Sequence, residues 1–233
     1  MRASAADETC RDALVLVHGV IVSSRYLMPL GVELADRYRV LIPDLPGYGL
    51  SDAPRAPLTL SALADAVIAC ADAAGYDRVA LAGNSFGAQV VVEAAVRHPE
   101  RVARVALLGP TVDPSARDLP RQYVRWQRGA PWEHPSAIPL MARDVADVGV
   151  ARAARLLRVM LADSIESKLP AVTCPALVVR GGRDHVAPAE WARLACRLLP
   201  DGRLVTVPGY GHMAHYSGPL AVASVLRPFL GAG

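Results

Sequence analysis

The segment Gly83 to Gly87, which reads Gly-Asn-Ser-Phe-Gly, places the strongest constraint on how this chain can fold. It follows a short apolar run, Arg78 to Ala82, and precedes a helix-like run, Ala88 to Arg97. Small residues two positions before and two positions after a serine let a strand and a helix approach closely through a sharp turn. Such a turn holds the serine hydroxyl out over the end of a sheet. The pattern therefore predicts that Ser85 is a nucleophile at a strand-to-helix elbow, with a chance turn as the alternative.

Apolar segments alternate with helical patterns along the chain. The apolar segments are nearly continuous, as expected of strands that are covered on both faces of a parallel sheet. They are Ala13–Val17, Val40–Ile42, Val79–Leu81, Val105–Leu108, Ala176–Val179 and Leu204–Val207. The clearest helix runs from about Leu60 to Ala74, with Thr59 as its N-cap and Gly75 just past its end. This alternation predicts a doubly wound α/β fold with a mostly parallel sheet, whose active site lies beyond the carboxyl ends of the strands.

One interval interrupts the alternation. Between about Leu108 and Pro175 there is no strand pattern, and helical patterns cover roughly 115–128, 140–146 and 150–168. We interpret residues 111–170 as a helical cap inserted over the carboxyl edge of the sheet. Residues 1–110 and 171–233 then form the core domain. Extra helices packed on a face of the sheet are the alternative interpretation.

Composition and charge narrow the classes of function. A chain of 233 residues that is 52% apolar and 20% charged is typical of a globular domain. The net charge of +3 is too small to argue for a nucleic-acid partner. The segment Met1 to Arg11 lacks the apolar core of a secretory signal, and no apolar run is long enough to span a membrane. We therefore expect a cytoplasmic protein that does not bind nucleic acid or membranes.

The cysteines give no sign of a metal site. Cys10, Cys70, Cys174 and Cys196 are widely spaced and form no C-x-x-C pair. Cys70 and Cys196 fall within helical patterns, where a cysteine usually acts as a small buried apolar residue. We therefore expect no bound metal.

A serine hydroxyl needs a base to take its proton, and histidine suits this role because its pKa lies near neutrality. His212 is the preferred candidate among the six histidines. It ends the glycine-containing segment Pro208 to His212 directly after the last predicted strand, where a loop can bring an imidazole above Ser85. His215 is its rival. His18, at the end of the first predicted strand, is expected to brace a loop by hydrogen bonding.

The base in turn needs a carboxylate that fixes its tautomer and stabilises its protonated form. Asp184 follows the fifth predicted strand, which gives the chain order Ser, Asp, His. Asp113, after the fourth predicted strand, is the fallback. The oxyanion formed on attack needs donors that already point at it. We expect these to be the backbone N–H groups of Phe86 and of Val20, in the loop after the first strand.

Together these residues resemble the α/β-hydrolase superfamily, in its cap-bearing, single-domain branch. The resemblance covers nearly the whole chain and rests on motifs in the expected order: His18-Gly19, Asp44 to Ser51, the Ser85 elbow, Gly182-Arg183-Asp184 with Pro188, and Gly211-His212 with Pro219. It implies a cofactor-free enzyme that uses Ser85, Asp184 and His212 and holds a small-molecule acyl substrate between cap and sheet.

The chain departs from the family pattern in two places. Relatives usually have one or two strands before the His-Gly loop, whereas only residues 1–12 precede the first predicted strand here. We therefore expect a reduced edge of the sheet, and an unpaired edge makes a homodimer an option. Relatives also often carry an acidic residue two positions before the final proline of the His motif, where this chain has Ser217.

The cap offers candidates for specificity. One or two of its arginines could face inward and hold an acidic group of the substrate, although a solvated outer face is the simpler interpretation. Tyr123, Trp126 and Trp132 could line an apolar pocket or anchor the cap to the sheet. Phe86, next to Ser85, could line the pocket or pack inside the fold.

The first functional hypothesis is a serine hydrolase that cleaves a small or medium ester, thioester or lactone through an acyl-enzyme on Ser85. The alternative is a hydrolase of carbon–carbon bonds in ring-fission diketones, because Asn84 beside Ser85 resembles the elbow of those enzymes. A third hypothesis is a non-hydrolytic member of the fold, either a ligand-binding protein or a biosynthetic catalyst.

Overall fold

One sheet forms the centre of the molecule. The computed structural model describes residues 2–3, 13–54 and 59–231, and within these ranges the sheet has seven strands in the order β1-β3-β2-β4-β5-β6-β7. The strands are β1 (Arg2–Ala3), β2 (Ala13–Val17), β3 (Arg39–Ile42), β4 (Val79–Asn84), β5 (Val102–Leu108), β6 (Ala176–Gly181) and β7 (Gly202–Val207). All neighbouring pairs are parallel except β1 with β3. The predicted doubly wound, mostly parallel α/β fold is confirmed.

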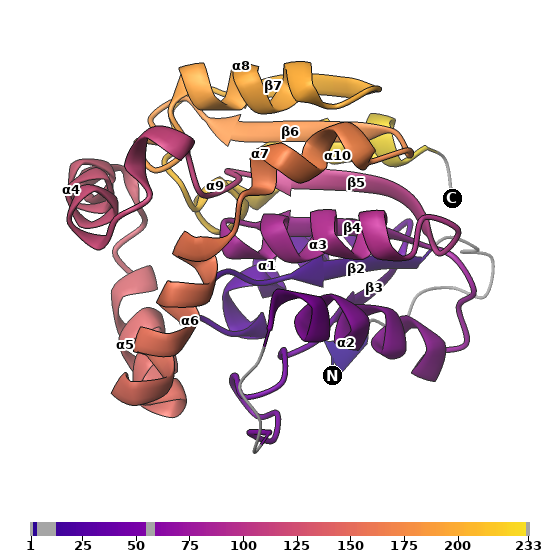
Figure 1. Ribbon diagram of the computed structural model, residues 1–233, viewed down its shortest axis with the longest axis horizontal. Coiled ribbons are helices and arrows are strands. Elements are labelled where there is room, and N and C mark those ends of the chain that lie inside the picture. Colours follow the sequence, from indigo (N-terminus) through magenta and orange to yellow (C-terminus); the bar gives the residue numbers. More distant parts are fainter. Residues whose placement is uncertain (1, 4–12, 55–58, 232–233) are drawn as a thin grey trace.

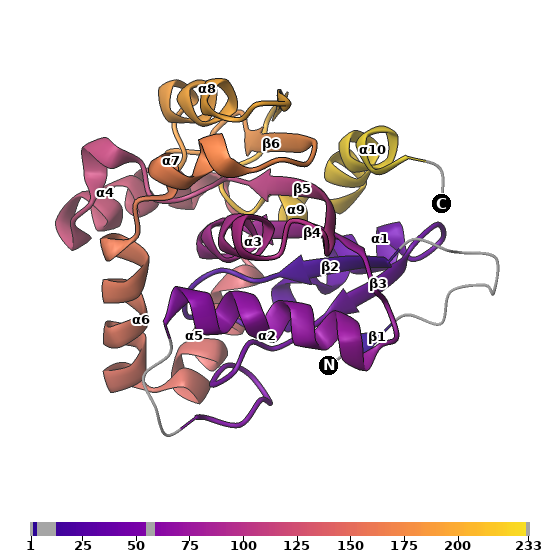
Figure 2. The same cartoon turned by 45° about the vertical axis from the view of Figure 1, so that its right-hand side comes forward.

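The apolar strands are buried because helices cover both faces of the sheet. In β2 every residue is buried: Leu14 and Leu16 pack on one face, and Val15 and Val17 on the other. Helices α1 and α10 cover the first face, and α2, α3 and α8 cover the second (Figures 1 and 2). Two-sided burial explains why the strand sequences show an apolar run in place of an alternating pattern.

Two of the helices outside the cap, α2 and α3, lie where the sequence analysis expected helical segments. The helices outside the cap are α1 (Met28–Leu34), α2 (Leu60–Ala73), α3 (Phe86–Arg97), α8 (Ala189–Leu198), α9 (Ala214–Ser217) and α10 (Pro219–Leu230), with a short 3-10 turn η1 (Ser24–Leu27) before α1. The predicted start of α2 is confirmed, since the Thr59 side chain accepts a hydrogen bond from the N–H of Ala62 at 3.1 Å.

Every regular element between β5 and β6 is a helix. This interval contains η2 (Pro114–Ala116), α4 (Leu119–Gly129), η3 (Ala130–Trp132), α5 (Ala137–Val148), α6 (Val150–Ala162), α7 (Ile165–Lys168) and η4 (Leu169–Ala171). Figure 1 places α4, α5 and α6 beyond the ends toward which the strand arrows point. We refer to residues 111–170 as the cap, following the division expected from the sequence. Of its helices, α4, α5 and α6 lie beyond the edge of the sheet at which the sequence predicts a site, whereas α7 packs against α3.

The N-terminal edge of the sheet contains a strand that the sequence analysis missed. β1 pairs antiparallel with β3, with Arg2 opposite Ile42 and Ala3 opposite Leu41. Two residues have no detectable periodicity, so no pattern could have identified this strand. Cys10 lies outside the described residues. The homodimer stays a prediction. In the described part of the chain no helix is both long enough and apolar enough to cross a membrane.

Candidate active site

Ser85 occupies the predicted elbow between β4 and α3. Its backbone has φ 57° and ψ −119°, a conformation that is strained for a residue with a side chain. A Cβ added at Gly83 would overlap the carbonyl of Gly87, and one added at Gly87 would overlap the carbonyl of Val17. The Ser85 N–H donates to the carbonyl of Leu108 at 2.9 Å, which ties the turn to β5. The two glycines therefore allow the close packing that holds Ser85 at the carboxyl end of β4.

His212 and Asp184 form a buried pair at the same edge of the sheet. His212 Nδ1 lies 2.9 Å from Asp184 Oδ2, and the two residues are only 7% and 3% exposed. The second oxygen, Asp184 Oδ1, accepts the N–H groups of Val186 at 2.8 Å and Ala187 at 2.9 Å. With Nδ1 bound to the carboxylate, Nε2 is the ring nitrogen left to exchange a proton.

The environment of His212 raises its pKa. Burial by itself lowers the pKa of His212, but the charge of Asp184, its hydrogen bond and the charge of Glu133 together raise this pKa above the ordinary value of 6.5. The same geometry stabilises a protonated imidazole, which is the form that a base takes after it accepts a proton.

Asp113 and His215, the alternatives to Asp184 and His212, make different contacts. The Asp113 carboxylate pairs with Arg125 at 2.7 Å and accepts the N–H of Ser115 at 2.8 Å. The ring of His215 packs edge-on against Tyr26, with ring centroids 4.6 Å apart. Neither ring nitrogen of His215 has a hydrogen-bond partner among the described residues. Burial, followed by the neighbouring His212, lowers the pKa of His215 to about 3.

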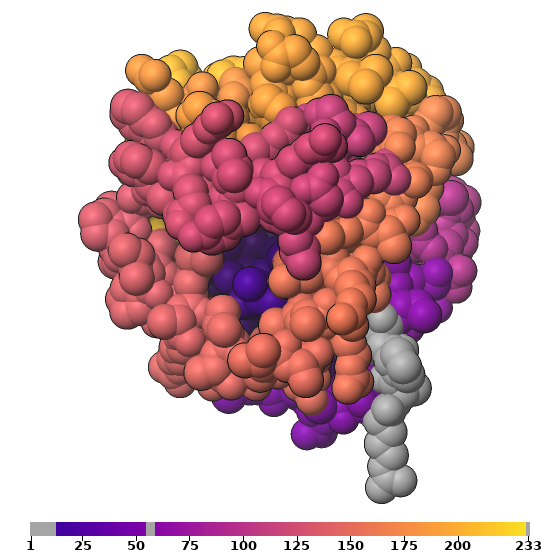
Figure 3. Space-filling view, turned by 60° about the vertical axis from the view of Figure 1, so that its left-hand side comes forward, coloured from indigo at the N-terminus to yellow at the C-terminus, as the bar shows by residue number. Residues whose placement is uncertain are grey.

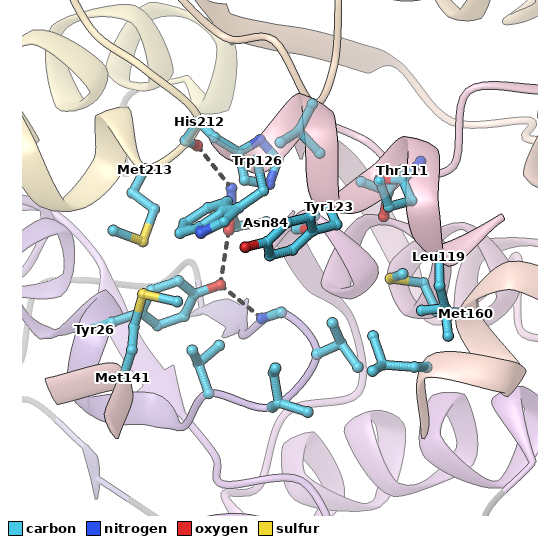
Figure 4. Close-up of a pocket in the computed structure, with 18 residues that line it drawn as sticks. Tyr26, Asn84, Thr111, Leu119, Tyr123, Trp126, Met141, Met160, His212 and Met213 are labelled. Atoms are coloured by element: carbon cyan, nitrogen blue, oxygen red, sulfur yellow. Dashed lines mark hydrogen bonds between the residues drawn. The ribbon is translucent and has the colours of Figure 1, made fainter. Parts of the chain in front are cut away.

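A hydrogen-bonded chain connects the loops around Ser85. The Gly19 N–H donates to the Tyr26 hydroxyl at 2.6 Å, and that hydroxyl donates to Asn84 Oδ1 at 2.8 Å. Asn84 Nδ2 donates to the carbonyl of Leu108 at 2.9 Å and to that of His212 at 3.4 Å. The dashed lines in Figure 4 follow part of this chain. The loop after β2, the elbow and the loop of His212 are thus linked to one another.

His18 braces the loop after β2, as expected from the sequence. Its Nε2 accepts the N–H of Leu45 at 3.0 Å, and its Nδ1 lies 2.9 Å from the carbonyl oxygen of Gly19. Burial lowers the pKa of His18 and favours the neutral ring that can accept this bond.

Two backbone N–H groups suit the role of oxyanion donors. Phe86 begins α3, so its N–H has no partner within the helix. Val20 follows Gly19 in the loop that packs against the elbow, where a Cβ added at Gly19 would lie 3.4 Å from Cβ of Ser85. In the part of the chain that the structure describes, neither N–H is bonded to another protein group. Both are therefore available to an oxygen beside Ser85.

A cavity of about 270 Å³ lies between the cap and the sheet. Its wall is mostly apolar and includes three methionines, and it also carries Ser85 and His212. The lining residues are Gly19, Val20, Ile21, Val22, Tyr26, Asn84, Ser85, Thr111, Leu119, Gln122, Tyr123, Trp126, Met141, Leu157, Met160, Val186, His212 and Met213. Figure 3 shows the molecule hollowed between the cap helices, with atoms from the N-terminal part of the chain at the bottom of the hollow. No lysine, arginine, aspartate or glutamate is part of this lining among the described residues.

The predicted pocket residues fall into two groups. Tyr123 and Trp126 of α4 line the cavity, and the Trp126 ring lies edge-on to that of His212 with centroids 6.3 Å apart (Figure 4). The suggestion that Phe86 lines the pocket is wrong, because its side chain is 0% exposed within the core under α3. Trp132 also lies away from the lining, and its ring packs under the guanidinium of Arg183 at 4.5 Å.

The cap arginines do not line the cavity. Arg117 pairs with Glu166 and Ser164, Arg125 pairs with Asp113, and Arg152 donates to the carbonyl of Gly47 at 3.0 Å. Their bonds hold the cap together or fix it to the core. The hypothesis that one of them reaches into the pocket finds no support in this arrangement.

Other polar residues between cap and core were missed by the sequence analysis. Asp144 of α5 is 1% exposed and accepts the N–H of Ser23 at 2.8 Å, the hydroxyl of Ser23 at 2.9 Å and Arg25 Nη1 at 2.5 Å. Glu133, after η3, contacts the main chain of His212. An isolated acidic residue in a helical pattern gives no sign of a partner that is far away in the sequence.

Known proteins with similar sequences and structures were compared with this chain. It matches the model of the alpha/beta hydrolase family over residues 14–225. It is similar to the pyrrolizixenacetamide deacetylase of Xenorhabdus hominickii, at 27% identity over 93% of this chain and 90% of that protein. A shorter stretch is similar to the 2-hydroxy-6-oxo-6-phenylhexa-2,4-dienoate hydrolase of Burkholderia cepacia, at 36% identity over 42% of this chain and 36% of that protein. A thermophilic esterase from Thermogutta terrifontis has a similar fold, with a TM-score of 0.83 at 24% identity, covering 98% of this chain and 91% of that one.

Proposed function

Because the chain belongs to the alpha/beta hydrolase family, we propose that this hydrolase cleaves a small, uncharged carboxylic ester, thioester or lactone through an acyl-enzyme on Ser85. The observation that supports the proposal most is the buried His212–Asp184 pair, since His212 lines the same cavity as Ser85 of the elbow. The proposal also takes the enzyme to be cytoplasmic and cofactor-free, with a homodimer as an option.

In each half of the proposed reaction, His212 acts first as a base and then as an acid. Ser85 Oγ attacks the substrate carbonyl while its proton passes to Nε2 of His212. The N–H groups of Val20 and Phe86 stabilise the oxyanion. The leaving alcohol or thiol takes the proton from His212 as the carbon–oxygen or carbon–sulfur bond breaks. Water, deprotonated by His212, then attacks the acyl carbon. As the bond from this carbon to Ser85 Oγ breaks, His212 returns the proton to Oγ and the acid is released.

The cavity supports an uncharged acyl group of modest size. Its volume of about 270 Å³ lies just below the usual range for sites of drug-sized ligands. Methionine and leucine side chains adapt well to an apolar acyl chain. With no lysine or arginine in the described lining, a carboxylate on the substrate would lose its hydration without gaining a cationic side chain as its partner. These features favour a short, neutral ester over an acidic substrate.

The carbon–carbon hydrolase is the weaker candidate. The similar Burkholderia enzyme is named for a dienoate, which carries a carboxylate, and that similarity covers less than half of this chain. The Asn84 amide is engaged with Tyr26 and with main-chain carbonyls, so it has a structural explanation that needs no special substrate. Amide cleavage is a second candidate, because the similar deacetylase is matched over most of both chains and an amide can follow the same acyl-enzyme route.

The first experiment tests whether Ser85 is the nucleophile. We expect a fluorophosphonate probe to label Ser85 in the folded protein and not in Ser85→Ala. Wild type should hydrolyse p-nitrophenyl acetate and butyrate, and Ser85→Ala should lose at least about a thousandfold in kcat. A vinylogous diketone and an acetanilide in the same panel separate carbon–carbon and amide cleavage from ester cleavage. A folded wild type that neither takes the label nor turns over any of these substrates would contradict the proposal.

A further inference from the structure

Glu133 connects the cap to the loop that carries the proposed base. Its Oε1 accepts the N–H of His212 at 2.5 Å and that of Met213 at 3.2 Å, and its Oε2 accepts the Met213 N–H at 3.1 Å. A single carboxylate of the cap therefore binds two successive N–H groups of the core. Bonds to an ionised acceptor are stronger than those between neutral groups.

The rest of the cap segment Trp132 to Ser136 docks on the same part of the core. The His134 N–H donates to Ser217 Oγ at 3.3 Å, and the hydroxyls of Ser136 and Tyr216 lie 2.8 Å apart. On the other side, the Trp132 ring packs under Arg183, next to Asp184 in the chain. This segment of the cap thus contacts both the loop of His212 and the loop of Asp184.

Gly211 shows how close this contact is. A Cβ added at Gly211 would overlap the Glu133 carboxylate and would lie 3.3 Å from Cβ of Trp132. The glycine before His212 therefore provides the space that the cap carboxylate occupies.

We propose that Glu133 is a positioning residue, whose carboxylate holds the main chain at His212 and Met213 so that the attachment of the cap and the alignment of the base depend on the same contact. This inference rests on the proposed function for its catalytic consequence. The contact itself can be tested without any substrate.

The charge of Glu133 gives a second, electrostatic effect. The charged and titratable groups around His212 are Asp184 after β6, Glu133 of the cap and His215 of α9, and Arg180 of β6 donates to the Asp184 carbonyl at 3.0 Å. Burial raises the pKa of Glu133 itself, and its bonds to the two N–H groups and the neighbouring His212 oppose this rise. Since the Glu133 charge raises the pKa of His212, its removal should make His212 lose its proton at lower pH.

The first experiment measures hydrogen exchange and needs no activity. In Glu133→Ala the amide hydrogens of His212 and Met213 should exchange about tenfold faster than in wild type, because each loses its acceptor. Peptides from α2 should exchange at unchanged rates. Glu166→Ala is the matched control, since Glu166 is a cap carboxylate that pairs with Arg117 and contacts neither amide. Equal exchange at 212 and 213 in wild type and Glu133→Ala would overturn the proposal.

The second experiment measures kinetics on a p-nitrophenyl ester. Glu133→Ala should lower kcat about 10- to 100-fold with little change in KM, because a base displaced by a fraction of an ångström transfers its proton poorly. Glu133→Gln keeps an acceptor oxygen and should recover most of kcat. The acidic limb of kcat/KM in Glu133→Gln should move to lower pH, because the charge that raises the pKa of His212 is lost. Glu166→Ala should match wild type.

The outcomes distinguish this inference from the proposed function. An inactive, unlabelled wild type would contradict the proposed function, and the exchange data would still decide the contact. An active wild type with unchanged kcat in Glu133→Ala would overturn the positioning role, and an unchanged acidic limb in Glu133→Gln would overturn the electrostatic effect. If Glu133→Ala does not fold, the Gln variant carries the test through its pH profile.

Discussion

At the scale of single residues, the site depends on strained or buried groups whose neighbours compensate for their cost. Ser85 keeps an unfavourable backbone conformation because the surrounding structure fixes the turn. The chain packs closely at Gly83 and Gly87, and the Ser85 N–H is bonded to the carbonyl of Leu108. The buried carboxyl group of Asp184 has hydrogen-bond partners on both oxygens, His212 on one and two N–H groups on the other. Changes at these positions should therefore alter activity more than changes at exposed positions.

The choice between the two histidines is testable. We expect His212→Ala to lower kcat on a p-nitrophenyl ester by at least about a thousandfold while the protein stays folded. His215→Leu should keep kcat within a few-fold, because the ring of His215 makes no hydrogen bond among the described residues and is neutral at neutral pH. A loss of activity confined to the His215 variant would show that the wrong base was chosen.

The pH dependence of the wild type follows from the direction of the His212 shift. His212 must be neutral to accept a proton, so kcat/KM should rise as pH increases through the pKa of His212 in the free enzyme. Because the net effect of its surroundings raises this pKa, the midpoint of the acidic limb should lie above 6.5. A pH profile of kcat/KM, measured where circular dichroism shows an intact fold, checks this. A midpoint below 6.5 would contradict the assigned pair.

Thr111 gives a prediction about stability. It lines the cavity, and its buried hydroxyl has no hydrogen-bond partner among the described residues. Replacing an unpaired buried hydroxyl by a methyl group removes a desolvation cost, so Thr111→Val should raise the free energy of unfolding by about 1 kcal/mol. Thr111→Ser keeps the hydroxyl, loses the methyl group and should be destabilised by about 1 kcal/mol. Urea unfolding measures both, and a destabilised Val variant would mean that the hydroxyl has a partner.

At the scale of elements, the cap is fixed to the loop after β2 by one buried carboxylate. Asp144 of α5 accepts bonds from Ser23, at the end of the loop that carries the proposed donor Val20, and from Arg25 of η1. The loop thus depends on α5 for part of its hydrogen bonding, and the cap helix has a role in addition to covering the cavity.

Loss of this carboxylate should be costly. Asp144→Ala leaves a buried N–H, a hydroxyl and a guanidinium with fewer partners, so we expect a loss of about 3 kcal/mol in the free energy of unfolding. Asp147→Ala removes the second carboxylate that pairs with Arg25. Because the Asp147 side chain is 34% exposed, this change should lower the free energy of unfolding by less than about 1 kcal/mol. Denaturant unfolding of the two variants measures the difference, and equal losses would contradict a special role for Asp144.

At the scale of the whole molecule, cap and core together enclose a cavity whose described lining contains no lysine, arginine, aspartate or glutamate, and this should set the substrate preference. The p-nitrophenyl esters of butyric acid and of succinic acid have equal acyl length, but only the second carries a free carboxylate. Burying that group without a partner costs several kcal/mol, so kcat/KM should favour the butyrate by about a hundredfold or more. Equal values for the two esters would mean that a cation reaches the bound substrate.

Much of the framework was predictable from the sequence because it depends on neighbours along the chain. The spacing of Gly83, Ser85 and Gly87 is a local backbone requirement, and the elbow formed where it was predicted. The apolar runs identified the parallel strands because strands covered on both faces tolerate few polar residues. Parallel strands bring their carboxyl ends to one edge, so the loops of Asp184 and His212 had to meet near Ser85.

The tertiary structure alone decided which side chains from distant segments meet. Sequence adjacency to Ser85 did not bring Phe86 into the cavity, because the first residue of α3 turns its side chain into the core. Nothing in the local pattern marks Tyr26, Glu133 or Asp144, whose partners are 58, 79 and 121 positions away. The sequence by itself therefore determined the order of the elements and the chemistry at their ends. Only the folded chain determined the walls of the cavity and the attachment of the cap, because those depend on contacts between surfaces that are far apart in the sequence.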